Sequence, residues 1–374
     1  MLLSVLAVLL TFGLVIFLHE AGHFLVCKRL GIRVIRFAFG FGPELFGVTS
    51  YGTRFSICAV PLGGYVKPAG ESIEDCTGHP DEYFSRSPWQ RLMVVAAGPV
   101  MNYVLAFALF FAVVALHGMP EPSTDPVIGE IASGYPAAKA GLQDGDRILS
   151  VDSIEVKTWA ELADVIHRSP GRKVALEYRR GDKLAKTETT PQLDTTLGYG
   201  LIGIKPKMMF VRVGFFRAAR EGAYQCWFWT AYTVQTLWQK IYRRERPDLA
   251  GPVGIVQMVS KAAHSGLEDL IFLIALISVA IGFFNLLPIP LLDGGHAVLY
   301  AWEGLSRRKL TIKTMTVANS IGLALLVSII LFATYNDILR LRESHRAQAA
   351  AGDAPAAQLK KGTSLRLPRR LRRG

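Results

Sequence analysis

Residues 14–26 read LVIFLHEAGHFLV, so a His-Glu-x-x-His motif lies inside a strongly apolar stretch. In a helix, at 100° per residue, His19 and His23 lie one turn apart on the same face. Both imidazoles can then reach a tetrahedral Zn²⁺, and Glu20 can polarise a water molecule. Burying a carboxylate at the centre of a membrane span costs about 2.5–3.5 kcal/mol on insertion scales, so such residues are retained mainly where they function. We predict that His19 and His23 bind zinc and that Glu20 is catalytic.

The composition indicates a membrane protein. The 374 residues are 51% hydrophobic and 19% charged, with a formal net charge of +12. Four apolar blocks are long enough to cross a bilayer, namely residues 2–26, 92–116, 270–287 and 317–335. The composition excludes collagen, a disulfide scaffold and, for most of the chain, intrinsic disorder. We expect a polytopic α-helical membrane protein with about four transmembrane helices.

A third zinc ligand is needed, and Asp293 is the best candidate. It lies in residues 285–296, NLLPIPLLDGGH, where two prolines break the third apolar block. A broken helix at membrane depth is tolerated only where it is buried in protein or lines a watery cavity, which suits an active site. His296 is a rival ligand, but its position three residues beyond the aspartate favours a supporting or interfacial place.

The segments between the apolar blocks predict three further regions. Residues 33–68 alternate with period two between glycines, which indicates short strands in hairpins. Residues 126–206 predict an α+β module with strands near 127–131, 147–151 and 174–178 and helices near 136–140 and 159–166. Residues 215–242 combine aromatic and basic side chains, which favours an amphipathic helix at the lipid headgroups, with a fifth span as the alternative.

The positions of the basic residues predict the orientation. The segment 28–91 carries eight Lys and Arg residues, and the turn at 307–313 carries four more, so both are expected on the cytoplasmic side. The α+β module is then on the extracytoplasmic side.

The C-terminal residues 337–374 hold ten Lys and Arg against three acidic residues. No aromatic and basic module accompanies this tail, so we expect a solvated tail or a contact with the lipid bilayer rather than nucleic acid.

Five motifs together resemble the site-2 protease family of intramembrane zinc metalloproteases, in its bacterial RseP-type branch. They are HExxH at 19–23, GGYVK at 63–67, AGPVMN at 97–102, GPVGI at 251–255 and NxxPxPxLDGG at 285–295. The resemblance covers nearly the whole chain except the basic tail. The module at 126–206 is similar to a circularly permuted bacterial PDZ domain, with AAKAGL at 137–142 as its recognisable part. PDZ domains bind peptides by adding a strand to a sheet edge.

The resemblance implies roles for individual residues. It implies that His19, His23 and Asp293 ligate Zn²⁺ and that Glu20 is the general base. It also implies that Asn285 and Asn102 help to position the substrate strand or stabilise the transition state. The strands at 33–68 resemble the family's membrane-associated β-hairpin, which pairs with an unwound substrate.

The same resemblance implies a biological setting. The substrates would be transmembrane segments of single-pass proteins, such as anti-sigma factors or signal-peptide remnants already trimmed by another protease. The protein would lie in the bacterial inner membrane, with the PDZ-like domain in the periplasm and the active site near the cytoplasmic side.

The predicted divisions are 1–118 (two transmembrane helices and the hairpins), 122–207 (PDZ-like domain), 208–260 (interfacial region), 261–338 (two transmembrane helices with the LDG motif) and 339–374 (basic, disordered tail). Two other classes of function are weighed against the protease. A silent membrane scaffold would hold partners without zinc. A transporter would use the broken span as an ion site and predicts inverted repeats, which the sequence does not show.

Overall fold

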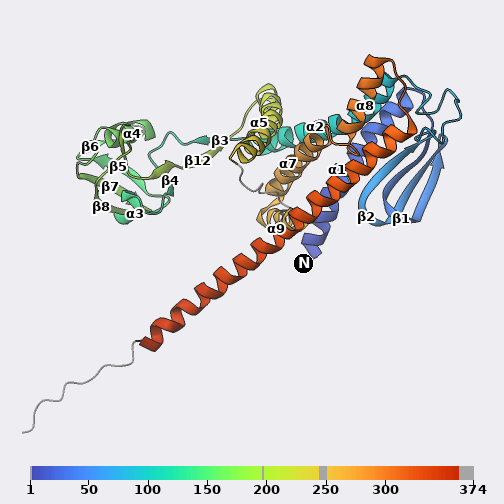
Figure 1. Cartoon of the computed structure of the whole chain (residues 1–374). Coiled ribbons are helices and arrows are strands. Elements are labelled where there is room, and N and C mark those ends of the chain that lie inside the picture. Colours follow the sequence, from blue (N-terminus) through green and yellow to red (C-terminus); the bar gives the residue numbers. More distant parts are fainter. Residues whose placement is uncertain (1, 196–197, 244–250, 362–374) are drawn as a thin grey trace, which may run out of the picture. The chain divides into compact units, whose positions relative to one another are not determined.

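The computed structural model describes residues 2–195, 198–243 and 251–361. Two compact units are found, one made of Met1–Phe111 with Ala219–Gly374 and the other of Ala112–Ala218. Figure 1 labels the elements. The helices are α1 (Leu2–Arg29), α2 (Pro88–His117), α3 (Pro136–Lys139), α4 (Trp159–His167), α5 (Phe215–Tyr242), α6 (Pro252–Ser265), α7 (Leu267–Asn285), α8 (Asp293–Ser306) and α9 (Ile312–Lys361). The strands are β1 (Val34–Ser50), β2 (Thr53–Pro68), β3 (Met119–Pro122), β4 (Ile128–Ile131), β5 (Arg147–Val151), β6 (Ile154–Glu155), β7 (Val174–Arg180), β8 (Lys183–Thr189), β9 (Gln192–Leu193), β10 (Gly200–Leu201), β11 (Ile204–Pro206) and β12 (Met208–Val211).

Four helices of the first unit are long and apolar enough to cross a membrane. They are α1, α2, Leu267–Leu286 and the first part of α9, Ile312–Arg340. Their outer faces expose large apolar side chains such as Leu6, Leu10 and Leu331. Such faces are unfavourable in water but suit the hydrocarbon core of a bilayer. The predicted four spans are therefore confirmed as helices.

Small residues allow the spans to approach closely. A Cβ atom on Gly22 of α1 would lie 2.3 Å from the carbonyl oxygen of Ala97 on α2. A Cβ atom on Gly282 of α7 would lie 3.2 Å from the carbonyl oxygen of Pro99. Since lipid offers no hydrophobic force between helices, close backbone packing of this kind is what holds spans together. Helix α2 is thereby fixed between α1 and α7.

The hairpin region differs from the expected short strands. β1 and β2 are 17 and 16 residues long and lie beside α1 (Figure 1). Residues 36–39 align with 64–67 along one edge and with 54–57 along the other, while 46–50 align with 53–57. The bends fall where Gly40 and Gly42 have positive φ angles of 89° and 86°, so glycine lets each strand turn and pair twice. Among the described residues, 64–67 form an outer edge of this sheet.

The second unit has its own hydrophobic core. Fully buried Ile148, Leu162 and Leu176 lie at its centre, and its largest sheet has the strand order β6-β5-β7-β8. Helix α4 begins with a capping box in which Thr158 and Glu161 satisfy each other's backbone N–H groups. The predicted strands and helices of the α+β module are all present. The predicted domain boundaries at 122 and 207 remain predictions.

The region predicted to be interfacial contains α5 and α6. Helix α5 packs Trp229 and Cys226 toward α2 and α7 and exposes Phe216, Trp227 and Trp238. Its place at the headgroups remains a prediction.

The C-terminal segment differs from the disordered tail expected from residue 339. Helix α9 continues as far as Lys361. Seven of residues 341–361 are alanine, the strongest helix former, although Gly352 and Pro355 also lie there. The basic residues at 366–373 lie outside the described part of the chain.

Candidate metal centre

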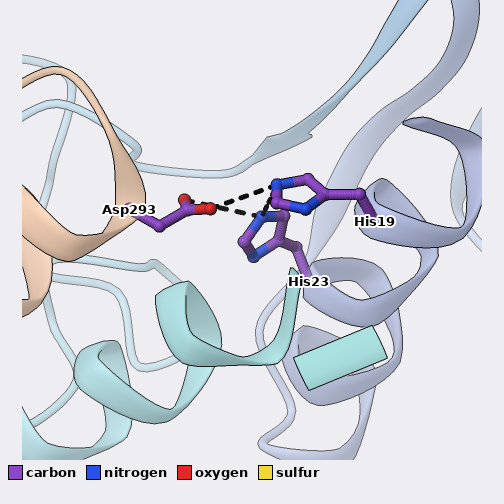
Figure 2. A group of neighbouring side chains, drawn as sticks. All are labelled: His19, His23 and Asp293. Atoms are coloured by element: carbon purple, nitrogen blue, oxygen red, sulfur yellow. Dashed lines mark hydrogen bonds and ion pairs between the residues drawn. The ribbon is translucent and has the colours of Figure 1, made fainter. Parts of the chain in front are cut away.

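Three side chains from two distant parts of the sequence meet between α1 and α8. His19 and His23 lie one turn apart on α1, and Asp293 is the first residue of α8 (Figure 2). The Nε2 atoms of the histidines are 3.2 Å apart. Asp293 places Oδ2 3.1 Å from Nε2 of His19 and Oδ1 3.6 Å from Nε2 of His23. Two nitrogens and a carboxylate thus face one point.

This donor set fits zinc. Tetrahedral zinc with bonds of about 2.0–2.1 Å requires ligand atoms about 3.3 Å apart, and the three measured separations lie around that value. Oδ2 of Asp293 is buried and has no hydrogen-bond partner among the described residues, although it lies beside an imidazole. A buried carboxylate oxygen without a partner is costly unless a cation satisfies it. His19, His23 and Asp293 are accordingly the residues that would hold the metal. Their ligand atoms lie within 4.8 Å of one another, and in the described part of the chain they form a group that could bind a metal ion.

The segment before Asp293 explains how one carboxylate reaches α1. Helix α7 ends at Asn285, and the chain then crosses seven non-helical residues before α8 begins. A Cβ atom on Gly294 would lie 2.3 Å from the carbonyl oxygen of Leu287, and one on Gly295 would lie 2.2 Å from that of Ile289. The two glycines therefore let the crossing segment fold tightly over the start of α8. Leu291 has a positive φ of 78° in this segment, a strained conformation for leucine.

Glu20 and an edge of the β-sheet line the same pocket. The pocket has a volume of about 650 Å³ and is lined by both histidines, Glu20, Asp293, Tyr65 and Val66, among others. The backbone N–H of Val66 is directed at the Glu20 carboxylate, and a Cβ atom on Gly64 would lie 3.6 Å from Cγ of Glu20. Residues 64–67 are the outer edge of the sheet, so this edge faces the glutamate.

Helix α2 supports the histidines from behind. Nδ1 of His23 lies 2.8 Å from the carbonyl oxygen of Val94, and Nδ1 of His19 lies 3.2 Å from Nδ2 of Asn102. Between these two positions, a Cβ atom on Gly98 would lie 2.3 Å from Nε2 of His23. Only glycine leaves room for the imidazoles at this point of α2.

Comparisons with known proteins agree with this geometry. The model of peptidase family M50 matches residues 7–329. The chain belongs to peptidase family M50. The zinc metalloprotease RasP of Geobacillus kaustophilus is 30% identical over 415 residues, covering 90% of this chain and 97% of that protein. A Mesorhizobium japonicum protein, provisionally named as a zinc metalloprotease, is 36% identical over 358 residues and covers 87% of this chain and 95% of its own length.

The M50 protease also has a segment similar to a solved domain. The PDZ domain of an SdrC-like protein from Listeria monocytogenes aligns with 23% of this chain and 90% of its own length, at 27% identity and a TM-score of 0.20. The predicted zinc metalloprotease agrees with the family match and with these relatives.

The remaining predicted residues of the M50 protease lie outside the ligand set. Asn285 is half-buried at the end of α7 and is not among the residues that line the described pocket. His296 does line the pocket, but its ring stacks on Tyr300 and is not part of the ligand group in the described chain. Asn102 is fully buried behind His19. The roles implied for Asn102 and Asn285, in positioning the substrate strand or stabilising the transition state, remain predictions.

Sequence reasoning missed two supports of the M50 site. Val94 acts through its backbone carbonyl, so its side chain carries no signal. Gly98 stands in the AGPVMN motif at 97–102, but the need for glycine there is visible only when α1 lies against α2.

Proposed function

We propose that this zinc metalloprotease cleaves peptide bonds within the transmembrane segments of single-pass membrane proteins. The observation that carries the proposal is the position of His19, Glu20 and His23 inside α1, a helix long and apolar enough to span the bilayer. A peptide bond that reaches these residues must itself lie at membrane depth.

The chemistry follows from the residues around the pocket. When bound, zinc supplies Lewis acidity, which makes water more acidic and polarises a carbonyl group. Glu20 accepts the proton at its carboxylate and then delivers it to the nitrogen of the leaving amine. His19, His23 and Asp293 hold the metal and transfer no proton in this scheme.

The sheet edge at 64–67 can supply hydrogen-bond partners for the backbone of an unwound substrate. A transmembrane helix must unwind before its backbone can be attacked, and lipid cannot replace the lost hydrogen bonds. An extended substrate that pairs with this edge regains them, as in other cases of strand addition. Because Val66 of this edge faces Glu20, the paired strand would lie beside the catalytic carboxylate.

The test is cleavage of a model single-pass substrate by the full-length protein in liposomes. The substrate has one apolar span and a short extracytoplasmic stub, and mass spectrometry locates the cut. We expect a cut within the span, and we expect Glu20→Gln to slow it by about 10²–10⁴-fold while zinc remains bound. A wild-type rate for Glu20→Gln, or cuts only outside the span, would contradict the proposal.

We further propose a bacterial inner-membrane location with the PDZ-like domain in the periplasm and the active site near the cytoplasmic side. The basic residues of segment 28–91 and of the 307–313 turn support this orientation. In a protein without its native cysteines, Lys183→Cys should react with an impermeant maleimide from outside, and Arg308→Cys should not. Both positions are exposed, so the reverse pattern would overturn the orientation.

The substrates we propose are anti-sigma factors or signal-peptide remnants that another protease has already shortened. The PDZ-like domain would bind a peptide segment of such a partner. A pocket of about 320 Å³ between α4 and the β10–β11 region, lined by Leu162, Ile166 and Ile202 among others, supports peptide binding. Titration of the full-length protein with peptides that end in apolar residues tests this, with Leu201→Asp, at a half-buried position of the pocket lining, expected to abolish binding.

A further inference from the structure

The second ring nitrogen of each histidine decides whether the first can bind a metal. A neutral imidazole that ligates through Nε2 must carry its proton on Nδ1. The group that faces Nδ1 therefore selects the competent tautomer. For His23 that group is the carbonyl oxygen of Val94, 2.8 Å away. A carbonyl can only accept, so the proton stays on Nδ1 and Nε2 is free to bind metal.

His19 has a different partner. Its Nδ1 lies 3.2 Å from Nδ2 of Asn102, and the Asn102 side chain is fully buried. An amide carries a donor at one end and an acceptor at the other. With Nδ2 facing the ring, Nδ1 of His19 must accept, and the proton moves to Nε2, where it blocks a metal bond. Oδ1 of Asn102 meanwhile has no hydrogen-bond partner among the described residues.

A half-turn of the amide reverses this relation. Nδ2 and Oδ1 have nearly the same shape and exchange places when the side chain rotates by 180°. Oδ1 then accepts from Nδ1–H of His19, and Nε2 presents its lone pair to the point shared with His23 and Asp293. Each orientation keeps one hydrogen bond to the ring, and only the second leaves Nε2 of His19 free to bind a metal.

We propose that Asn102 is a positioning residue that sets the tautomer of His19 for zinc binding. This inference rests on the zinc site of the proposed function. Asn102 is held in place by α7, because Ser278 donates a 2.8 Å hydrogen bond to the backbone oxygen of Asn102. A Cβ atom on Gly282 would lie 3.2 Å from its Cβ. Val94 and Asn102 are two turns apart on α2, so one helix selects both tautomers.

Two substitutions separate hydrogen bonding from packing. Asn102→Leu keeps the volume and offers no acceptor, whereas Asn102→Asp presents an oxygen to Nδ1 in either orientation. Thr11→Val is the matched control, because Thr11 of α1 is also a fully buried polar residue and does not line the described pocket. Zinc affinity of the full-length protein in detergent is measured by competition with a chelator, and cobalt absorption reports the ligand geometry.

The expected pattern is specific to a tautomer role. Asn102→Leu should weaken zinc binding by about 10–100-fold, Asn102→Asp should bind within about threefold of wild type or tighter, and Thr11→Val should be unchanged. Zinc binding by Asn102→Leu within twofold of wild type would overturn the proposal. So would equal losses in the Leu and Asp variants, or in the Leu variant and the Thr11 control.

If Asn102→Leu is not recovered folded, the cobalt spectrum of Asn102→Asp decides. A tetrahedral band like that of the wild type supports the proposal, and its loss refutes it. These readouts do not use cleavage. Failure of the cleavage test with intact zinc affinities would contradict the proposed substrate class and leave the role of Asn102 standing.

Discussion

The two units of the chain both bury apolar side chains, and they differ most in what covers their outer surfaces. In Ala112–Ala218 the fully buried residues include Ile148, Leu162 and Leu176, and most ion pairs lie at the surface. In the membrane unit, Arg91 and Asn102 are buried, while large apolar side chains cover the exposed faces of the spans. The hydrophobic effect stabilises the first arrangement, whereas close backbone contact and hydrogen bonding stabilise the second. The histidines can be buried in the membrane unit because α2 places polar partners beside them, the carbonyl of Val94 and the side chain of Asn102.

The largest effect is expected where the membrane unit is packed most closely around polar groups. Gly98→Ala places a methyl group 2.3 Å from Nε2 of His23 and 2.7 Å from Cε1 of His19. The imidazoles must move away from Asp293, so zinc content should fall from about one per chain to near zero, with loss of cleavage. Metal analysis of the purified protein checks this. Gly214→Ala, where a Cβ atom meets nothing within 4 Å, should retain its zinc.

The second prediction concerns a buried ion pair beneath α8. Arg91 of α2 lies 2.9 Å from Glu303 and is stacked between the rings of Phe84 and Tyr300, 4.8 and 4.7 Å from their centres. Arg91→Met leaves the Glu303 carboxylate buried without its cation, which should cost about 3–5 kcal/mol of unfolding free energy. Unfolding in a denaturing detergent measures this loss.

A double variant sharpens that test. Replacing both partners, as Arg91→Met with Glu303→Leu, removes the uncompensated charge, so most of the stability should return. If the double variant is as unstable as the single one, the stacking of Arg91 on the two rings matters more than its charge.

The sequence predicted what depends on local patterns and missed what depends on packing. The spans and the motif at His19 follow from periodicity and spacing along one segment. The choice of Asp293 needed the broken helix and the family resemblance. By contrast, the pairing of Arg91 with Glu303 joins residues 212 positions apart, and no local pattern marks it. The double pairing of β1 and β2 was missed because period-two alternation predicts strands but does not say which edges meet.

The third prediction tests the independence of the inserted unit. Leu162 of α4 is fully buried in that unit's core, so Leu162→Ala should lower its stability by about 2–5 kcal/mol. Hydrogen exchange should show faster opening of β5 and β7 while the amides of α1 keep their protection and zinc content is unchanged. Faster exchange in α1 would show that the two units unfold together, contrary to the division of the chain.

The smallest effect is expected in the loop before α2, where the membrane unit holds a carboxylate with hydrogen bonds instead of a cation. Glu82 accepts from the hydroxyl and N–H of Thr77 and from the N–H groups of Gly78 and His79. The bond from the Thr77 side chain is the main cause that lowers the pKa of Glu82 to about 2. A lowered pKa means that the carboxylate stabilises the folded loop fully above its ordinary value of 4.5, and that this stabilisation is lost as the pH falls toward about 2.

The measurement compares wild type with Glu82→Gln, which cannot ionise. Protease sensitivity of residues 70–86 should be higher in the variant above pH 5, and the difference should shrink steadily at lower pH as the wild-type carboxylate is protonated. Thr77→Val should move the wild-type transition to higher pH, because it removes the hydrogen bond that contributes most to the shift. A difference between wild type and Glu82→Gln that stays constant down to pH 2 would mean that the charge of Glu82 has no part in holding this loop.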